Sequence, residues 1–203
     1  KEYRRQRQMC IRDRQGSSDT EVLLAAIEAW GIERTVKQLD GIFAFGVLDT
    51  LSHRLYLVRD RFGVKPLVFG WKDGSFFFAS DIRILKQLSN AHPRISSGAV
   101  NLFLRYGYVG SQYTLFNEVY KLCPASYLSL GYDDFAEPAS YCDLLASKRV
   151  REYWCRTPPH TKIACSESEA LEELERLLIR SIESQTLSDV PLGAFLSGGV
   201  DSV

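Results

Sequence analysis

The first part of the chain carries a helical pattern of apolar residues, followed by short segments with strand character. Ser18 and Glu21 form an S-x-x-E capping box at the start of the helical pattern. Apolar residues then recur at helical spacing from Leu23 to Trp30, and Gly31 ends the pattern after about three turns. Tight turns, including an Asp-Gly pair, separate the segments that follow. These segments predict an antiparallel sheet with strands at 42–49, 55–59, 67–71 and 75–79.

The pattern becomes helical again after Asp81 and then changes twice more. Apolar stripes at 82–88 and 100–104 predict two helices, and the segment between 115 and 130 favours an extended chain. Residues 131–165 carry two adjacent aspartates and three prolines, and this composition predicts a linker between domains.

A further helix and a strand are predicted near the end of the chain. Ser166 and Glu169 form another capping box, and an apolar stripe runs from Leu171 to Ile182. Residues 189–196 predict a buried strand, which a loop follows. We expect this helix and this strand to be poorly packed.

Composition and charge restrict the classes of function. The chain has 203 residues, about one domain and a third, and 45% of them are hydrophobic, which excludes general disorder. It has 25 basic and 25 acidic residues, and this zero net charge argues against a nucleic-acid coat. Six of the basic residues lie within residues 1–14, but this stub has no aromatic interleaving that would favour nucleic-acid binding.

Cysteine, histidine and hydropathy patterns favour a cytoplasmic protein without a metal cluster or a membrane span. The five cysteines are odd in number and form no C-x-x-C pair, which argues against a disulfide framework or a zinc ribbon. The three histidines lie far apart from one another in the sequence. No apolar run approaches the roughly 18 residues of a membrane span, and the first residues lack a signal-peptide core.

The strongest chemical signal is the S-G-G-V-D-S string at 197–202, which directly follows the predicted strand. Its two glycines would let backbone N–H groups approach an anion closely, and the serines at both ends add hydroxyl donors. A following helix would direct its positive end to the same point. Asp201 has the wrong charge for a phosphate contact, so it fits a Mg²⁺ ligand beside the phosphate. The alternative is an ordinary Gly-Gly turn, in which aspartate and serine are common turn residues.

The longer string V-P-L-G-A-F-L-S-G-G-V-D-S resembles the pyrophosphate loop of ATP pyrophosphatase synthetases, and most of all that of glutamine-dependent asparagine synthetases. Four upstream segments are similar to the glutaminase half of the same family, in matching order and spacing. They are S-D-T-E-V-L-L at 18–24, L-D-G-I-F-A-F-G at 39–46, V-R-D-R-F-G-V-K-P-L at 58–67 and F-A-S-D at 78–81. The resemblance covers residues 17–203 and includes the loop.

The resemblance implies an α/β protein with two domains. Residues 16–155 would form part of a class II glutamine amidotransferase domain, an incomplete four-layer α/β/β/α sandwich of the N-terminal-nucleophile type. Residues 166–203 would form the first elements of a Rossmann-like ATP pyrophosphatase domain. Residues 1–15 do not resemble the family, and we interpret this basic stub as an artefact outside the fold.

The activity that the resemblance implies is that of a carbon–nitrogen ligase with glutamine as amido donor. Glutamine hydrolysis would supply ammonia, which passes through an internal tunnel and attacks a β-aspartyl-adenylate. Aspartate, glutamine and ATP would thereby yield asparagine, glutamate, AMP and pyrophosphate. The expected partners are these small molecules, with ATP and Mg²⁺ as cofactors and a homodimer as one assembly, and without nucleic acid or membrane.

Site residues follow from the resemblance only where this sequence matches a motif. Asp19 matches the aspartate that binds the glutamine α-amino group, although a carboxylate at a helix start also interacts favourably with the helix dipole. Leu196 matches a residue that lines the ATP site, and Asp201 matches the magnesium ligand. The residues that match the pyrophosphate loop are Ser197, Gly198, Gly199, Asp201 and Ser202.

Three features depart from the family or stay unassigned. The family's nucleophile is a cysteine at position 1 whose own α-amino group is the base, but residue 1 here is lysine. Cys10 lacks the glycine that follows the family's cysteine, and the motifs that hold the glutamine carboxylate are missing. The charged residues of segment 59–65 indicate either an inter-domain network or a solvated turn. We therefore expect an internal fragment that, alone, neither hydrolyses glutamine nor makes asparagine.

Two alternatives stay open. A related ATP-dependent amidotransferase would act on another carboxylate, for example on a glycan-linked or secondary-metabolite substrate. A non-catalytic nucleotide-binding relative would keep the loop and lack the nucleophile. A parent reading frame that begins Met-Cys-Gly would favour the enzyme over the non-catalytic relative.

Overall fold

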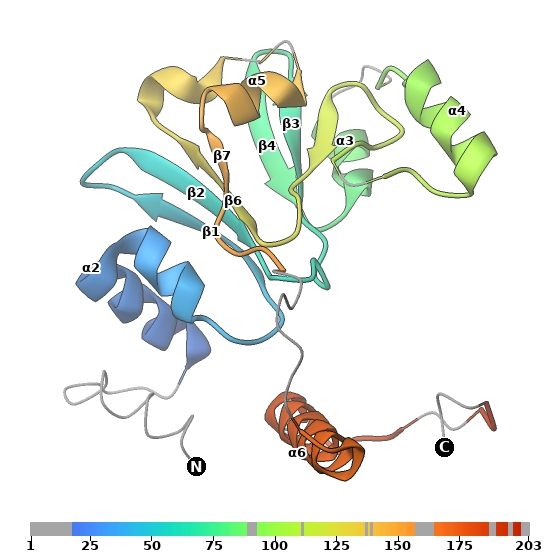
Figure 1. The fold of residues 1–203 in the computed structure, drawn as a ribbon. Coiled ribbons are helices and arrows are strands. Elements are labelled where there is room, and N and C mark those ends of the chain that lie inside the picture. Colours follow the sequence, from blue (N-terminus) through green and yellow to red (C-terminus); the bar gives the residue numbers. More distant parts are fainter. Residues whose placement is uncertain are drawn as a thin grey trace. The chain divides into compact units, whose positions relative to one another are not determined.

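The chain divides into two compact units, Lys1–Arg156 and Thr157–Val203. The structure is a computed structural model that describes residues 18–88, 93–110, 112–136, 138, 140–156, 165–186, 190–194 and 197–199. Figure 1 shows the first unit as two sheets with helices beside them, and the second unit as one long helix.

The first helix, α2 (Asp19–Gln38), confirms the predicted helix and continues beyond its predicted end. Ser18 is its N-cap residue, as predicted, but its side chain accepts the Thr20 N–H, and the predicted capping box with Glu21 is not formed. Gly31 interrupts the helix with φ 73° and ψ 167°, a conformation that glycine adopts without a steric penalty. A second helical segment follows Gly31 because Ile32 and Val36, one turn apart, are buried on its inner side.

The four predicted strands are present, but they belong to two antiparallel sheets. The first sheet has the order β1-β2-β6-β7, and the second has the order β4-β3-β5. The strands of the first sheet are β1 (Ala44–Asp49), β2 (Arg54–Arg59), β6 (Ser126–Leu130) and β7 (Val150–Glu152). Those of the second sheet are β3 (Val68–Lys72), β4 (Ser75–Ala79) and β5 (Val119–Lys121).

The two sheets pack face to face around the main core of the first unit. Alternate residues of β2 and β6, such as Leu57 and Leu128, pack in one cluster with Phe69 and Trp71 of β3. All four of these side chains are essentially inaccessible to water. Since successive side chains of a strand point to opposite faces, the remaining residues of each strand point away from this core.

The outer faces of the two sheets are covered by helices, which gives four layers. Val58 of β2 and Tyr127 of β6 pack against α2. On the other side, Val68 of β3 packs against the 3₁₀ helix η1 (Ile82–Ile84) and the helix α3 (Leu85–Leu88). The α/β/β/α layering predicted for this part of the chain is therefore confirmed.

The prediction of a linker at 131–165 is wrong for the part that the structure describes. This region contains η2 (Tyr132–Phe135), α5 (Tyr141–Ala146) and β7, which pairs with β6. Tyr141 of α5 is buried in the core between the sheets. The polar residues that indicated a linker act as local caps, because Asp134 accepts the Gly131 N–H and Asp143 forms a capping box with Ser140. Residues 157–164 lie outside the described residues.

The second unit contains the predicted helix but not the predicted strand. Helix α6 (Glu167–Gln185) begins at the predicted capping box of Ser166 and Glu169, and it has no buried residue, as expected. Residues 190–194 form no strand, and 189, 195 and 196 lie outside the described residues. A strand needs a neighbour for its backbone hydrogen bonds, and the described part of this unit includes no other strand.

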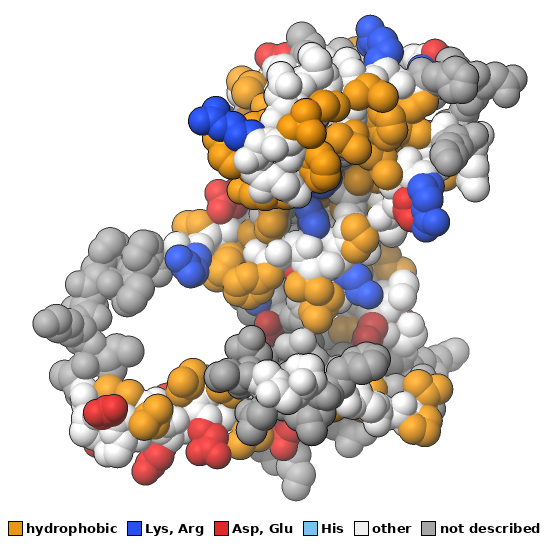
Figure 2. All heavy atoms as spheres, turned by 90° about the vertical axis from the view of Figure 1, so that its right-hand side faces the viewer, with side chains coloured by type: hydrophobic (Ala, Val, Ile, Leu, Met, Phe, Trp, Pro, Cys, Tyr) orange, Lys and Arg blue, Asp and Glu red, His pale blue; other side chains and the backbone are white. Residues whose placement is uncertain are grey.

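Helix α4 (Ser97–Tyr106) confirms the predicted helix at 100–104 but contributes little to the core. Ala99 is its only buried residue, whereas Phe103, Leu104 and Tyr106 are exposed. Figure 2 shows hydrophobic side chains gathered on the face of the molecule where this helix lies. None of the described helices is long and apolar enough to cross a membrane.

We predict that Leu128→Ala lowers the free energy of unfolding by about 2–5 kcal/mol, because it opens a cavity between the two sheets. Urea titration followed by tryptophan fluorescence measures this change, since the three tryptophans lie in the first unit. Leu51→Ala is the matched control, because Leu51 is 94% exposed. Equal effects of the two substitutions would contradict the packing described above.

Candidate functional site

The described part of the predicted phosphate loop consists of Ser197, Gly198 and Gly199. Gly198 has φ 72°, a left-handed conformation that favours glycine. A Cβ atom at this position would meet no atom within 4 Å, so the backbone conformation, and not a lack of space, favours glycine here. A left-handed residue within a short loop allows neighbouring N–H groups to converge on an anion. The phosphate-binding role of the loop stays a prediction. Leu196, Asp201 and Ser202 lie outside the described residues, so the magnesium assignment of Asp201 stays a prediction.

Asp19 is the first residue of α2 and lies directly after the N-cap residue. Its side chain is exposed, and Glu21 is a second acidic residue in the same helical turn. Both interpretations made from the sequence fit this position, since an exposed carboxylate can bind an ammonium group and also interacts with the helix dipole. Asp19 belongs to the first unit and the phosphate loop to the second.

The second segment of α2 is fixed to the first sheet by a polar network around Glu33. Tyr127 and Arg151 both donate to the same carboxylate oxygen of Glu33, each at 2.6 Å. The Tyr127 hydrogen bond and the Arg151 charge lower the pKa of Glu33 although burial opposes this. Burial, with Glu33 beside the phenol, raises the pKa of Tyr127 to about 12. The network therefore keeps a charged acceptor and a neutral donor at neutral pH.

Gly31 connects this fixed segment to the part of α2 that carries Asp19. The residues before Gly31 are half-buried or exposed, whereas Ile32, Thr35 and Val36 after it are buried. The direction of the first segment, and hence the position of Asp19, therefore depends on the backbone conformation at Gly31.

The charged segment after β2 is a loop that is held from inside by Asp60, while Val64 and Lys65 are exposed. Asp60 is 1% exposed, and its carboxylate accepts the backbone N–H groups of Phe62, Val64 and Lys65 at 3.0–3.1 Å. Burial, the largest single effect, favours the neutral acid, but the backbone N–H groups together outweigh it and lower the pKa of Asp60. Its carboxylate therefore holds the loop in its ionised form.

Arg59 fixes the same loop from the opposite side. Its guanidinium donates to the carbonyl oxygens of Gly63, Lys65 and Leu122. Because Arg59 ends β2 and Leu122 follows β5, these bonds join the first sheet to the second. Sequence reasoning left both Arg59 and Asp60 unassigned, since a run of charged residues does not show which of them the fold buries.

The described residues include no group of three side chains that could hold a metal ion, and the described cysteines are free. Cys10 lies outside the described residues. Cys123 is half-buried and accepts a hydrogen bond from the Tyr141 hydroxyl at 3.5 Å. Burial raises the pKa of Tyr141, so this donor stays protonated at neutral pH.

Two families match the chain. Residues 1–142 match the glutamine amidotransferase domain, and residues 173–203 match asparagine synthase. The first range begins at residue 1 and so includes the basic stub. The second range includes most of α6 and the whole S-G-G-V-D-S loop.

The chain is also similar to curated proteins along most of its length. Asparagine synthetases (glutamine-hydrolyzing) 3 and 1 of Bacillus subtilis are both 30% identical to it, over 92% and 91% of this chain and 28% and 27% of theirs. Amidase chry2 of Gibberella zeae is 28% identical over 92% of this chain and 26% of its own. The chain thus spans about a third or less of the length of the curated relatives it matches.

We predict that Asp60→Asn lowers the free energy of unfolding at pH 7 by about 2 kcal/mol, because a neutral amide oxygen accepts weaker hydrogen bonds than a carboxylate and the amide Nδ2 cannot accept at all. The pKa of Asp60 is lowered by folding, so its contribution is present at neutral pH and is lost as the pH falls below about 4. Urea titrations at several pH values should therefore show a difference from the parent protein that shrinks in acid. A difference that stays constant with pH would contradict the role of the Asp60 charge.

Proposed function

The chain belongs to the glutamine amidotransferase domain family, and from this premise we propose that it takes part in glutamine-dependent asparagine synthesis. One observation carries the proposal: a glutamine amidotransferase match and an asparagine synthase match follow one another in a single chain. The first match covers most of the four-layer unit, and the second includes the loop where Gly198 is left-handed. A donor of ammonia and a user of ammonia are thereby joined covalently.

The proposed reaction has two halves. Glutamine and water give glutamate and ammonia in the first. In the second, the β-carboxylate of aspartate attacks the α-phosphorus of ATP, and pyrophosphate leaves. Ammonia then attacks the β-carbonyl carbon, and AMP leaves with the pair of electrons of the broken C–O bond. The products are asparagine, glutamate, AMP and pyrophosphate.

The chain's own residues would bind and orient these groups. The Asp19 carboxylate would bind the α-ammonium group of glutamine, as its exposed position allows. The backbone around Gly198, with the hydroxyls of Ser197 and Ser202, would donate hydrogen bonds to the departing diphosphate. Asp201 would ligate Mg²⁺, and Leu196 would line the nucleotide site. The metal, when bound, neutralises negative charge on the phosphate oxygens.

Joining the two halves in one polypeptide has a chemical reason. Ammonia released into water at pH 7 becomes ammonium, which is no nucleophile, so a route that excludes water would preserve its reactivity. Residue 1 is lysine where the family resemblance calls for cysteine. We therefore propose that these 203 residues alone release no glutamate from glutamine.

A second candidate is an amidotransferase that activates a carboxylate other than that of aspartate. The similarity to amidase chry2, which is not named as an asparagine synthetase, favours this candidate. It requires the same phosphate loop and the same use of glutamine, and it differs in the acceptor alone. Supplying aspartate therefore separates the two candidates.

We predict that the longest polypeptide encoded by the gene that contains these residues releases pyrophosphate from ATP only when aspartate and Mg²⁺ are present. Gly198→Ala should lower this rate by about 10–100-fold, because alanine is strained at φ 72°. Gly110→Ala is the control, since Gly110 has no left-handed φ, has open space around it and lies outside the string that resembles the pyrophosphate loop. Pyrophosphate release that does not depend on aspartate would favour the second candidate. If no carboxylate supports pyrophosphate release, the proposal is overturned.

We predict that Asp19→Asn in the same polypeptide raises the KM for glutamine by about 10–100-fold, because a charge-assisted hydrogen bond to the substrate is lost. Synthesis from added ammonium chloride should keep its rate, since it does not use the glutamine site. Glu28→Gln, an exposed position on the same helix, provides the control. An unchanged KM for glutamine would contradict the glutamine-binding role of Asp19 and leave only its interaction with the helix dipole.

A further inference from the structure

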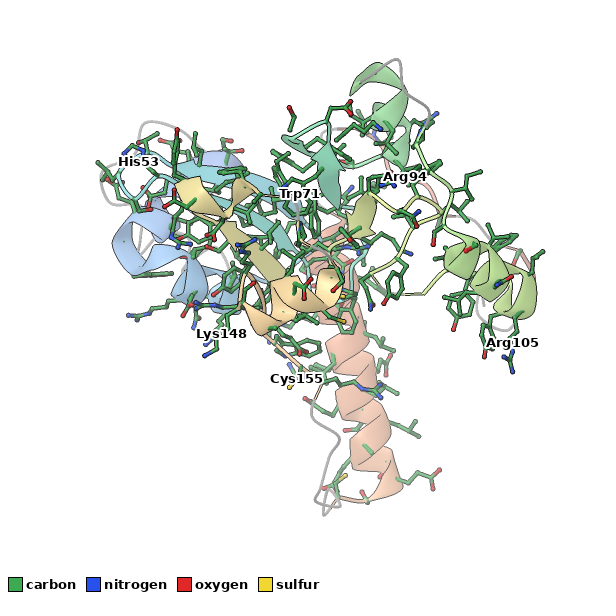
Figure 3. All side chains as sticks on the ribbon, turned by 90° about the horizontal axis from the view of Figure 1, so that it is seen from above. His53, Trp71, Arg94, Arg105, Lys148 and Cys155 are labelled. Carbon is green, nitrogen blue, oxygen red and sulfur yellow. The ribbon has the colours of Figure 1, made fainter. Side chains whose placement is uncertain are left out.

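A shallow depression lies where the turn between β3 and β4 meets the segments that precede α4 and β5. Its volume is about 330 Å³, within the usual range of small-molecule sites. Neither Asp19 nor the phosphate loop lines it. The lining residues are Trp71, Lys72, Asp73, Gly74, Arg94 and Glu118, of which Trp71 and Arg94 are labelled in Figure 3.

Glu118 is the unusual residue of this depression, because it is a buried carboxylate that is only half satisfied. It is 7% exposed, and its Oε1 accepts a hydrogen bond from Arg94 Nε at 2.5 Å. Its Oε2 is buried and accepts no hydrogen bond from any residue that the structure describes. A buried acceptor without a donor costs about 1–3 kcal/mol, and more when it is charged. A donor group of a ligand would remove this cost.

The Glu118 carboxylate stays ionised at neutral pH. Burial is the largest effect and favours the neutral acid, but the Arg94 side chain and the backbone N–H groups of Glu118 and Arg94 together outweigh it and lower the pKa of Glu118. The carboxylate is therefore negative, and the Arg94 side chain that contacts it is 75% exposed.

The backbone around Glu118 is held firmly. Its carbonyl oxygen accepts the Trp71 N–H, and it lies so near Gly70 that a side chain there would place its Cβ 2.1 Å away. The Trp71 indole is fixed in turn, because its N–H donates to the carbonyl oxygen of Phe135 at 2.7 Å. The backbone of Glu118 therefore cannot move away from the depression without breaking these contacts.

The turn supplies charged groups of both signs beside Glu118. Lys72 and Asp73 make no side-chain hydrogen bond or ion pair with the residues that the structure describes. Asp73 and Gly74 both have positive φ values, 51° and 75°, as the tight turn of a hairpin requires. The depression thus combines a buried carboxylate, one oxygen of which lacks a donor, with a lysine ammonium that makes no hydrogen bond or ion pair with the described residues.

We propose that this depression binds a free α-amino acid, with its ammonium group on Glu118 and Asp73 and its carboxylate on Lys72 and Arg94. An α-amino acid carries a donor cation and an acceptor anion close together, which is the complement of this lining. A simple cation would leave Lys72 unpaired, and a simple anion would face the Glu118 charge. The proposal does not depend on the proposed function, because none of its residues belongs to the glutamine site or the phosphate loop.

The test is a titration of the ¹⁵N-labelled 203-residue chain with each protein L-amino acid, followed through its backbone amide signals. We expect at least one amino acid to shift the amides of Lys72, Asp73, Gly74 and Glu118 with a Kd between about 0.1 and 10 mM. The N-acetyl and methyl ester derivatives of that amino acid should bind at least about 10-fold more weakly, because each lacks one charge.

Two variants and one control separate binding from folding. Glu118→Gln and Lys72→Gln should each weaken binding by about 10-fold or more, and Lys72 makes no contact that the fold needs. Lys65→Gln, an exposed lysine outside the depression, should leave the Kd unchanged. The proposal is overturned if no amino acid shifts these amides, as when water alone occupies the site. It is equally overturned if both variants keep the parent Kd.

Discussion

The first unit depends on keeping two sheets face to face, because each sheet has an apolar face that would otherwise contact water. Leu57 and Leu128 on one sheet and Phe69 and Trp71 on the other are essentially inaccessible to water. Such burial contributes about 1.5–3 kcal/mol for each large side chain. The chain must cross from one sheet to the other without burying unpaired polar groups, and Arg59 and Asp60 make this possible by pairing with the crossing loop.

The same constraint places Asp19 on the outside of the sandwich. Helix α2 covers the outer face of the first sheet, and Glu33 fixes its second segment to Tyr127 and Arg151. Gly31 then turns the first segment, so that Asp19 lies exposed at its start. The proposed glutamine contact is thus held by a rigid core that takes no part in the chemistry, which is how many binding residues are positioned.

The two proposed sites differ in how the protein prepares them. At the phosphate loop a left-handed glycine shapes the backbone, and the ligand would be held mainly by N–H groups. At the depression beside β3, the hairpin turn carries Lys72 and Asp73, and the buried carboxylate of Glu118 lies beside them. The first arrangement suits a polyanion, and the second suits a small molecule with both charges.

The sequence by itself determined the features that depend on near neighbours. The caps at Ser18 and Ser166, the hairpin turn at Asp73 and the break at Gly31 follow from residues a few positions apart, and each is where the sequence predicts it. The sequence motifs likewise indicated the family.

Only the tertiary structure decided the rest. Pairing of β7 with β6 turns a polar-looking linker into core, and long-range packing selects Asp60 and Glu118 for burial from among many acidic residues. The physical reason is that burial depends on segments far apart in the sequence, which no local pattern records.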